Sequence, residues 1–153
     1  MAKKIVILED NAERRAAMQV CLQDRFHQFE IVFLSDACAM QRCCEADLDD
    51  AIVIALDHDL ELVPGPDGRC FDPGTGRDVA NYLAGKKPVC PVVIHSTNSS
   101  AAVGMEMVLQ QGGWKTYRVI PGDDLDWIAT AWFRTLRRAI VDNASPRKPS
   151  GAR

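Results

Sequence analysis

The chain has 153 residues, of which 47% are hydrophobic and 25% charged, and this length suits one domain with a buried core. A formal net charge of −3 at pH 7 argues against a broad nucleic-acid surface. The first apolar run, residues 5–8, is too short for a signal peptide or a membrane span, so we expect a cytoplasmic protein without a membrane partner. The six cysteines are then expected to stay reduced.

Strand-like and helix-like stretches alternate along the chain. Short β-branched runs predict strands at 3–8, 29–34, 51–56, 91–94 and 116–120. Apolar stripes predict helices over about 12–25, 37–46, 77–83, 99–111 and 125–141. Three of these helices have candidate N-caps, namely Asn11, Ser35 or Asp36, and Asp123 or Asp124.

This alternation predicts an α/β fold, a doubly wound five-stranded parallel sheet in the order 2-1-3-4-5 with helices on both faces. We assign residues 1–142 to this domain and expect residues 143–153, rich in Pro, Ser and basic residues, to form a disordered tail.

The stretch 61–75 interrupts the alternation. Its many breakers predict that it holds no regular element: they are Pro64, Gly65, Pro66, Gly68, Pro73 and Gly74. A loop this long in a compact domain is usually a lid or a binding loop, and a surface insertion without a role is the alternative.

Two carboxylates and an imidazole follow the third predicted strand. They are Asp57, His58 and Asp59, and the run before them, 51–56, is apolar enough to be a strand buried on both faces. Burying these groups in a core would be costly, so we place them in a crevice that solvent reaches, at the carboxyl edge of the sheet. A helix start or a turn is the alternative explanation, because Asp favours both.

Polar motifs follow three strands that are neighbours in the predicted order. The first strand ends in Glu9 and Asp10, the third in residues 57–59, and the fourth in residues 95–98, which read His-Ser-Thr-Asn. The carboxyl ends of parallel strands share one edge of the sheet, so the three motifs are expected to meet in one crevice.

The sequence resembles the receiver domains of response regulators over residues 3 to about 141. The resemblance lies in an acidic pair after the first strand, an Asp after the third, a hydroxyl residue after the fourth and Pro121 after the fifth. The resemblance implies a receiver, flavodoxin-like fold in which the acidic pair, Glu9 and Asp10, holds Mg²⁺ and the Asp after the third strand, Asp57, accepts a phosphoryl group. The lysine that contacts phosphate in receivers is replaced by Ile120, and Lys115 lies too early in the strand to substitute for it.

Four further motifs resemble the cyclic-phosphate processing receiver-like domains. They are Leu56-Asp57-His58-Asp59-Leu60, Thr75-Gly76-x-Asp78, His95-Ser96-x-Asn98 and Gly104-Met105. This resemblance implies a phosphoesterase or hydrolase activity in which two histidines act on cyclic phosphates of nucleotides or RNA ends.

The chemistry itself calls for an acid and a base. Opening a cyclic phosphodiester requires a base that activates water and an acid that protonates the leaving alkoxide, and His58 and His95 can serve as this pair. Asp57 or Asp59 could orient His58. Strand alternation would put Asp57 and Asp59 on one side of the chain and His58 on the other.

The remaining polar residues are candidates for phosphate and metal binding. Ser96 and Asn98 could donate hydrogen bonds to phosphate oxygens. Asp78 is a candidate substrate contact, with a helix cap as its alternative. A divalent cation on Glu9, Asp10 and an Asp of the third motif, Asp57 or else Asp59, would neutralise the phosphate; Mg²⁺ is expected, with Mn²⁺ as the alternative.

A signalling role is the alternative to catalysis. In that case the domain would bind a protein partner, with or without phosphorylation of Asp57. Three groups of residues are expected to serve structure alone: His27 at the surface, Trp127 and Trp132 in the core, and Arg134, Arg137 and Arg138 on a solvated helix face.

Overall fold

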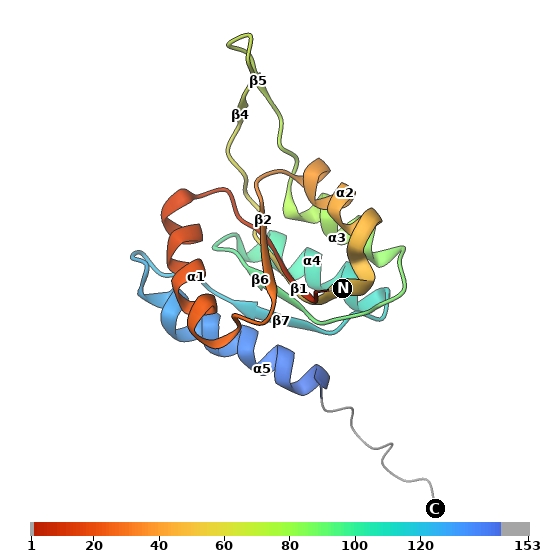
Figure 1. Ribbon diagram of the computed structural model, residues 1–153. Helices are drawn as coiled ribbons and strands as arrows, with labels where there is room; N and C mark the ends of the chain where they lie inside the picture. The colour runs from red at the N-terminus through yellow and green to blue at the C-terminus, as the bar shows by residue number, and fades with distance from the viewer. Residues whose placement is uncertain (1, 145–153) are drawn as a thin grey trace, which may run out of the picture.

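The computed structural model describes residues 2–144. Its five-stranded parallel sheet has the order β2-β1-β3-β6-β7, which is the predicted 2-1-3-4-5 arrangement. The strands are β1 Lys4–Leu8, β2 Glu30–Leu34, β3 Ala51–Leu56, β6 Val92–His95 and β7 Thr116–Val119. The predicted fold is therefore confirmed, and every strand lies within two residues of its predicted bounds (Figure 1).

Two layers of helices cover the sheet (Figure 1). The helices are α1 Ala12–Arg25, α2 Ala37–Asp47, α3 Gly76–Ala84, α4 Ser99–Gln111 and α5 Phe133–Ala144, with a 3₁₀ turn, η1 Leu48–Asp50, and a π-helical turn, η2 Ile128–Trp132. Helices α1 and α5 pack on one face with η2, and α2, α3 and α4 pack on the other. Each face has its own apolar core, as a doubly wound sheet requires.

Side-chain caps fix where the helices start. The side chains of Asn11, Asp36 and Asn98 accept hydrogen bonds from the backbone N–H of the third residue of α1, α2 and α4. Asn11 was the predicted cap of α1, and this prediction is confirmed. Of the two candidates for α2, Asp36 and not Ser35 is the cap. At α3, the N–H of Thr75 donates to the carboxylate of Asp78 over 2.9 Å in a capping box.

The last helix differs from its prediction at both ends. The side chain of Asp124 accepts a hydrogen bond from the N–H of Asp126, which closes a turn before the helix, and the π-helical turn η2 then precedes α5. Trp127 and Trp132 are buried, as expected, and the three arginines of this helix are exposed. Because α5 runs to Ala144, Asn143 and Ala144 belong to the helix and not to the predicted tail. The rest of that tail, 145–153, lies outside the described residues.

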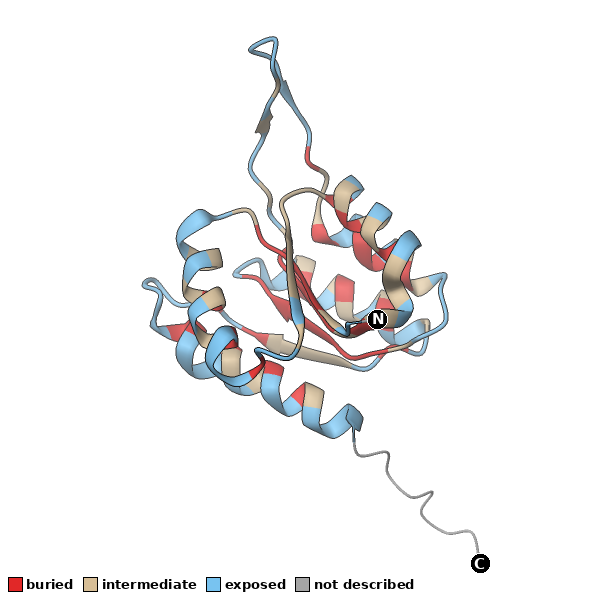
Figure 2. Cartoon of the chain, viewed as in Figure 1, coloured by how far each residue is buried: buried red, intermediate tan, exposed pale blue. Residues whose placement is uncertain are grey.

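The stretch between β3 and α3 forms a hairpin that projects from the domain (Figure 1). Its two short antiparallel strands are β4 Val63–Pro64 and β5 Cys70–Phe71. The prediction that this stretch holds no regular element was therefore wrong. The N–H of Gly65 donates to the carbonyl of Arg69, and Gly68 turns the chain with a φ of +79°, which glycine tolerates at no steric cost. Most of the hairpin is exposed (Figure 2).

Glycine 76 lets α3 start against the end of β3. Its N–H donates to the carbonyl of His58 over 3.0 Å, and a Cβ at this position would lie 1.9 Å from the carbonyl oxygen of Asp57. No larger residue fits there without moving the backbone of the Asp57 motif. This close approach fixes the position of residues 57 and 58 relative to α3.

Within residues 2–144, no helix is both long and apolar enough to cross a membrane. All six cysteines are free thiols, and only Cys44 and Cys90 are fully buried. Burial raises the pKa of both thiols to about 12, so they stay protonated and inert at neutral pH.

Candidate functional site

Glu9, Asp57 and His95 meet on the face of the sheet that α1 and α5 cover. Each continues the alternation of its strand on that face, after Ile7, Ala55 and Val93 respectively. Because β1, β3 and β6 are adjacent, the three side chains converge just past the strand ends. One potential ligand atom from each lies within 4.8 Å of the others. We call Glu9, Asp57 and His95 the buried trio.

The buried trio holds polar atoms that find no hydrogen-bond partner among the described residues. Glu9 and His95 are 0% exposed and Asp57 is 5% exposed. Nε2 of His95 lies 3.3 Å from Oε1 of Glu9, but not in hydrogen-bond geometry, so that oxygen and both imidazole nitrogens stay unpartnered. Buried polar groups are nearly always satisfied, so this arrangement indicates a site for a ligand.

Aromatic rings enclose the imidazole of His95. Its ring centroid lies 6.0 Å from that of Trp127 and 6.2 Å from that of Trp132, which it meets edge-on. The other carboxylate oxygen of Glu9 accepts a hydrogen bond of 3.1 Å from the N–H of Asn11. The imidazole is therefore held between Glu9 and the two tryptophan rings, away from solvent.

Arg14 of α1 is the positive charge next to the buried trio. Its Nη1 lies 3.5 Å from Oε1 of Glu9 and 3.7 Å from Oδ2 of Asp57, and its guanidinium stacks over the ring of Trp127 at 5.4 Å. The sequence analysis missed this residue. An arginine in the first turn of the helix after the acidic pair was the available signal.

The two carboxyl groups of the trio differ in acidity. Burial raises the pKa of Asp57 to about 6, and the nearby imidazole of His95, the N–H of His58 and the guanidinium of Arg14 only partly offset this increase. Burial also raises the pKa of Glu9, but His95, the N–H of Asn11 and Arg14 together outweigh it, so the pKa of Glu9 is lower than usual. Glu9 is therefore the firmly ionised carboxylate of the pair.

Replacing Asp57 with Asn is expected to stabilise the metal-free protein at pH 7 by about 1–3 kcal/mol, because ionised Asp57 is costly when buried. The folded-state pKa, about 6, lies above the ordinary 3.8. The free-energy cost of ionising Asp57 in the folded state therefore grows as pH rises from about 4 to 6. Below about pH 4 Asp57 is protonated in both states, and the variant is no longer more stable than wild type. Chemical denaturation of both proteins with chelator across this range measures the effect. Equal stability of the two proteins at every pH would contradict the raised pKa of Asp57.

His58 and Asp59 form a second, more accessible pair. Nδ1 of His58 lies 2.8 Å from Oδ1 of Asp59; the imidazole is half-buried and the carboxylate is exposed. The expectation that Asp57 and Asp59 share one side was wrong, because the strand ends at Leu56 and the chain bends at His58. Asp57 belongs to the buried trio, whereas Asp59 contacts the imidazole of His58.

The other predicted site residues lie around the same edge with separate contacts. Asp10 accepts a hydrogen bond from the backbone N–H of Glu61 at the base of the hairpin, and the buried-trio cluster does not include it. The hydroxyl of Ser96, which is buried, accepts a hydrogen bond of 3.1 Å from the N–H of Asn98. Asn98 is exposed and uses its carboxamide oxygen to cap α4.

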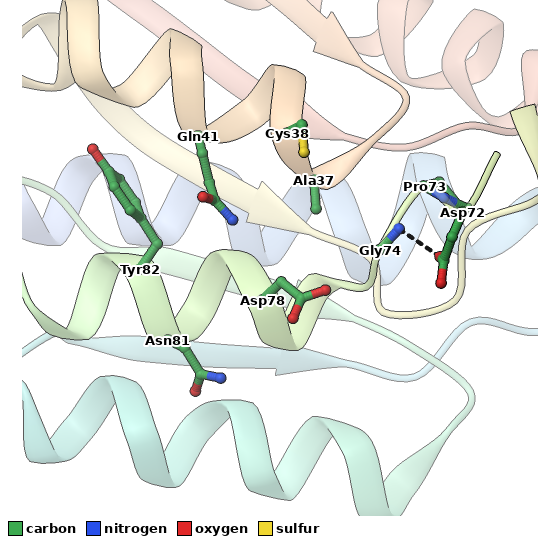
Figure 3. A pocket seen from close by; sticks show the side chains of 9 residues that line it. All are labelled: Ala37, Cys38, Gln41, Asp72, Pro73, Gly74, Asp78, Asn81 and Tyr82. Carbon is green, nitrogen blue, oxygen red and sulfur yellow. Dashed lines mark hydrogen bonds between the residues drawn. The ribbon is translucent and has the colours of Figure 1, made fainter.

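Asp78 lies in a different place. Besides capping α3, it lines a groove of about 640 Å³ between α2 and α3, together with Ala37, Cys38, Gln41, Asp72, Pro73, Gly74, Asn81 and Tyr82 (Figure 3). Neither the buried trio nor His58 lines this groove. Asp78 thus has the capping role that was its alternative interpretation.

The fold and this site define a receiver-type domain. The receiver domain of a response regulator from Rhodospirillum rubrum has 15% sequence identity and a TM-score of 0.65, over 94% of this chain and 95% of that one. The phosphorylated cyanobacterial phytochrome response regulator RcpA has 19% identity and a TM-score of 0.61, over 98% and 100%. The Mn²⁺-bound response regulator Rcp1 has 17% identity and a TM-score of 0.58, over 89% and 90%. At these identities the likeness shows the fold alone.

The match to a sequence family identifies the chain more closely than the structural likeness does. The family model of the cyclic-phosphate processing receiver domain matches residues 4–111, which is more than half of the chain. The chain therefore belongs to the cyclic-phosphate processing receiver domain family. A comparison with curated proteins finds no significant match.

Proposed function

We propose that this domain is a metal-assisted phosphoesterase that opens cyclic phosphates of nucleotides or RNA ends at the carboxyl edge of its sheet. One observation carries the proposal. The fully buried, unpartnered atoms of Glu9 and His95 lie beside Asp57, and the accessible pair of His58 and Asp59 follows Asp57 directly in the chain. A cation site and a proton-transfer group are the two parts that such a reaction needs. The family of the chain agrees with this chemistry.

His58 is proposed to transfer protons. In ring opening, water gives a proton to the imidazole as its oxygen bonds to phosphorus, one ring P–O bond breaks, and the imidazolium gives the proton to the leaving alkoxide. An imidazole exchanges protons near neutral pH, and Asp59, 2.8 Å from Nδ1, holds that nitrogen as the N–H so that Nε2 is the free base. The side chain of His58 is 16% exposed and its Nε2 is not among the fully buried atoms without a partner, so this nitrogen is proposed to meet water or a leaving oxygen.

Glu9, Asp57 and His95 are proposed to hold a divalent cation. Two carboxylates and an imidazole fit such an ion, and Oε1 of Glu9 and one imidazole nitrogen of His95, which have no hydrogen-bond partner, would each gain one. When bound, the cation would neutralise the negative charge of the phosphate. The nitrogen ligand favours Mn²⁺ over Mg²⁺, which prefers oxygen ligands and bound water. This changes the expected role of His95, since its side chain is 0% exposed.

The remaining candidates complete the proposed site. The NH₂ group of Asn98 is proposed to donate to a phosphate oxygen, because the cap uses only the carboxamide oxygen. The hydroxyl of Ser96 would keep the turn before α4 in place. Asp10, which ties the base of the hairpin through Glu61, would position the hairpin beside the substrate.

The direct test is turnover of 2′,3′-cyclic and 3′,5′-cyclic nucleotides by the purified chain with Mn²⁺, with Mg²⁺ and with chelator. We expect hydrolysis to a monophosphate that Mn²⁺ supports better than Mg²⁺ and that chelator abolishes. Hydrolysis that survives chelation would reject the cation, and the absence of turnover under all conditions would reject the phosphoesterase.

A signalling module that binds a protein partner is the second candidate. The projecting hairpin favours it, because Leu62 and Phe71 are 63% and 51% exposed there and offer apolar contacts. In this case Asp57 would accept phosphate from acetyl phosphate, and Asp57→Asn would abolish the labelling. A chain that is never labelled but binds its partner through the hairpin would be an interaction module without phosphorylation.

A further inference from the structure

Arg14 stands between solvent and the buried trio. It belongs to the first turn of α1, its side chain is 27% exposed, and its Nη1 faces one carboxylate oxygen of Glu9 and one of Asp57. The ring of Trp127 lies under the guanidinium at 5.4 Å. Stacking of this kind orients the plane of the guanidinium and leaves its edge available for hydrogen bonding.

The guanidinium has donors to spare. Its contacts with Glu9 and Asp57, at 3.5 and 3.7 Å, are longer than the usual N–H···O hydrogen bond of roughly 2.7–3.2 Å. The ion pairs therefore provide charge attraction without using up the five N–H groups that a guanidinium offers. A planar fork with free donors next to a partly open site matches the geometry of a phosphate group.

Within residues 2–144, no other lysine or arginine forms an ion pair with the buried trio. Ile120, the residue before Pro121 at the end of the last strand, is apolar and 69% exposed. The lysine closest to Ile120 in the sequence is Lys115, and its Nζ lies over the ring of Tyr117, 5.5 Å from the ring centroid. Positive charge for an anionic ligand at this edge thus comes from α1 and not from the end of β7.

We infer that Arg14 is a phosphate-binding residue, whose guanidinium donates hydrogen bonds to non-bridging oxygens of the phosphate while Glu9 and Asp57 hold it in place. The inference rests on the proposed function in one respect, namely that a phosphate group occupies this edge. It does not depend on turnover, because binding of a phosphate can be measured without any reaction.

The experiment measures binding of inorganic phosphate and of Mn²⁺ to the full chain by calorimetry, with tryptophan fluorescence as a second readout. Arg14→Ala is expected to weaken phosphate binding by about tenfold to a hundredfold, the loss typical of charge-assisted hydrogen bonds. Its affinity for Mn²⁺ should stay the same or rise, because a positive charge next to two carboxylates is gone. Arg14→Lys keeps the positive charge but loses the planar guanidinium with its paired N–H donors, and should bind phosphate with an affinity between those of wild type and Arg14→Ala.

Arg15→Ala is the matched control. Arg15 is the next residue of α1, and its Nη1 contacts the hydroxyl of Ser35 at 3.1 Å while its guanidinium stacks over Phe33 at 5.4 Å. Its removal should change phosphate affinity by less than about twofold. If circular dichroism shows that Arg14→Ala does not fold, the phosphate affinity of Arg14→Lys is compared with that of wild type instead.

The inference is overturned if the wild-type chain binds no phosphate, or if the Arg14 variants bind it as tightly as wild type. Phosphate binding that depends on Arg14 in a chain without cyclic-nucleotide turnover would uphold the inference and reject the proposed phosphoesterase. Turnover that is unaffected by loss of Arg14 would uphold the phosphoesterase and reject the role of this residue.

Discussion

Replacing His58 with alanine is expected to lower the turnover of a 2′,3′-cyclic nucleotide by about a hundredfold or more, the range for loss of a general acid or base. The physical reason is the geometry of the pair that His58 forms. Asp59 lies 2.8 Å from Nδ1 and is proposed to keep the proton on that nitrogen, which would leave Nε2 to accept a proton from water or pass one to the leaving oxygen. The measurement is kcat of the Mn²⁺-loaded variant with saturating substrate.

Two further variants make this result specific. His27→Ala removes an exposed histidine remote from the site in the sequence, and should leave kcat unchanged. Asp59→Asn should retain Mn²⁺ binding but lower kcat by a smaller factor, because the imidazole stays while its orientation is less defined. If His58→Ala keeps the wild-type kcat, proton transfer by His58 is excluded, and the reaction would have to proceed through another group.

Much of this geometry follows from the alternation of side chains along strands. Residues 51–56 could be recognised as a buried central strand, so the placement of Asp57 at the carboxyl edge followed from the order 2-1-3-4-5. The same alternation, extended from Ile7, Ala55 and Val93, predicts that Glu9, Asp57 and His95 share one face. Extending it past Leu56 to Asp59 failed, because the chain is no longer extended there.

Other features depend on contacts that no local pattern encodes. Arg14 reaches the trio because α1 packs on the same face of the sheet and Trp127 supports its guanidinium, and both depend on how helices pack. The hairpin at 61–75 contains four strand residues although its composition favours a loop, since tight turns tolerate the glycines and an edge strand tolerates Pro64. Asp10 was expected with the metal ligands, but its carboxylate meets the backbone of Glu61, a partner that only the hairpin fold supplies.

Replacing His95 with alanine is expected to weaken Mn²⁺ binding by at least tenfold to a hundredfold, because the proposed site would keep two ligands of three. His95 is 0% exposed, its imidazole nitrogens have no hydrogen-bond partner in the described part of the chain, and Oε1 of Glu9 lies 3.3 Å from Nε2. Turnover should fall together with metal binding and recover in part at high Mn²⁺. The measurement is calorimetric titration of Mn²⁺ into wild type and variant.

The two histidines can be separated by comparing their variants. His58→Ala should bind Mn²⁺ as wild type does, whereas His95→Ala should not, and His95→Gln should restore part of the affinity by offering an oxygen ligand to the same position. If His95→Ala instead binds Mn²⁺ normally but has lost turnover that high Mn²⁺ does not restore, His95 acts in proton transfer with His58. That outcome would require the site to open in solution, because an imidazole enclosed by Trp127 and Trp132 cannot reach a substrate.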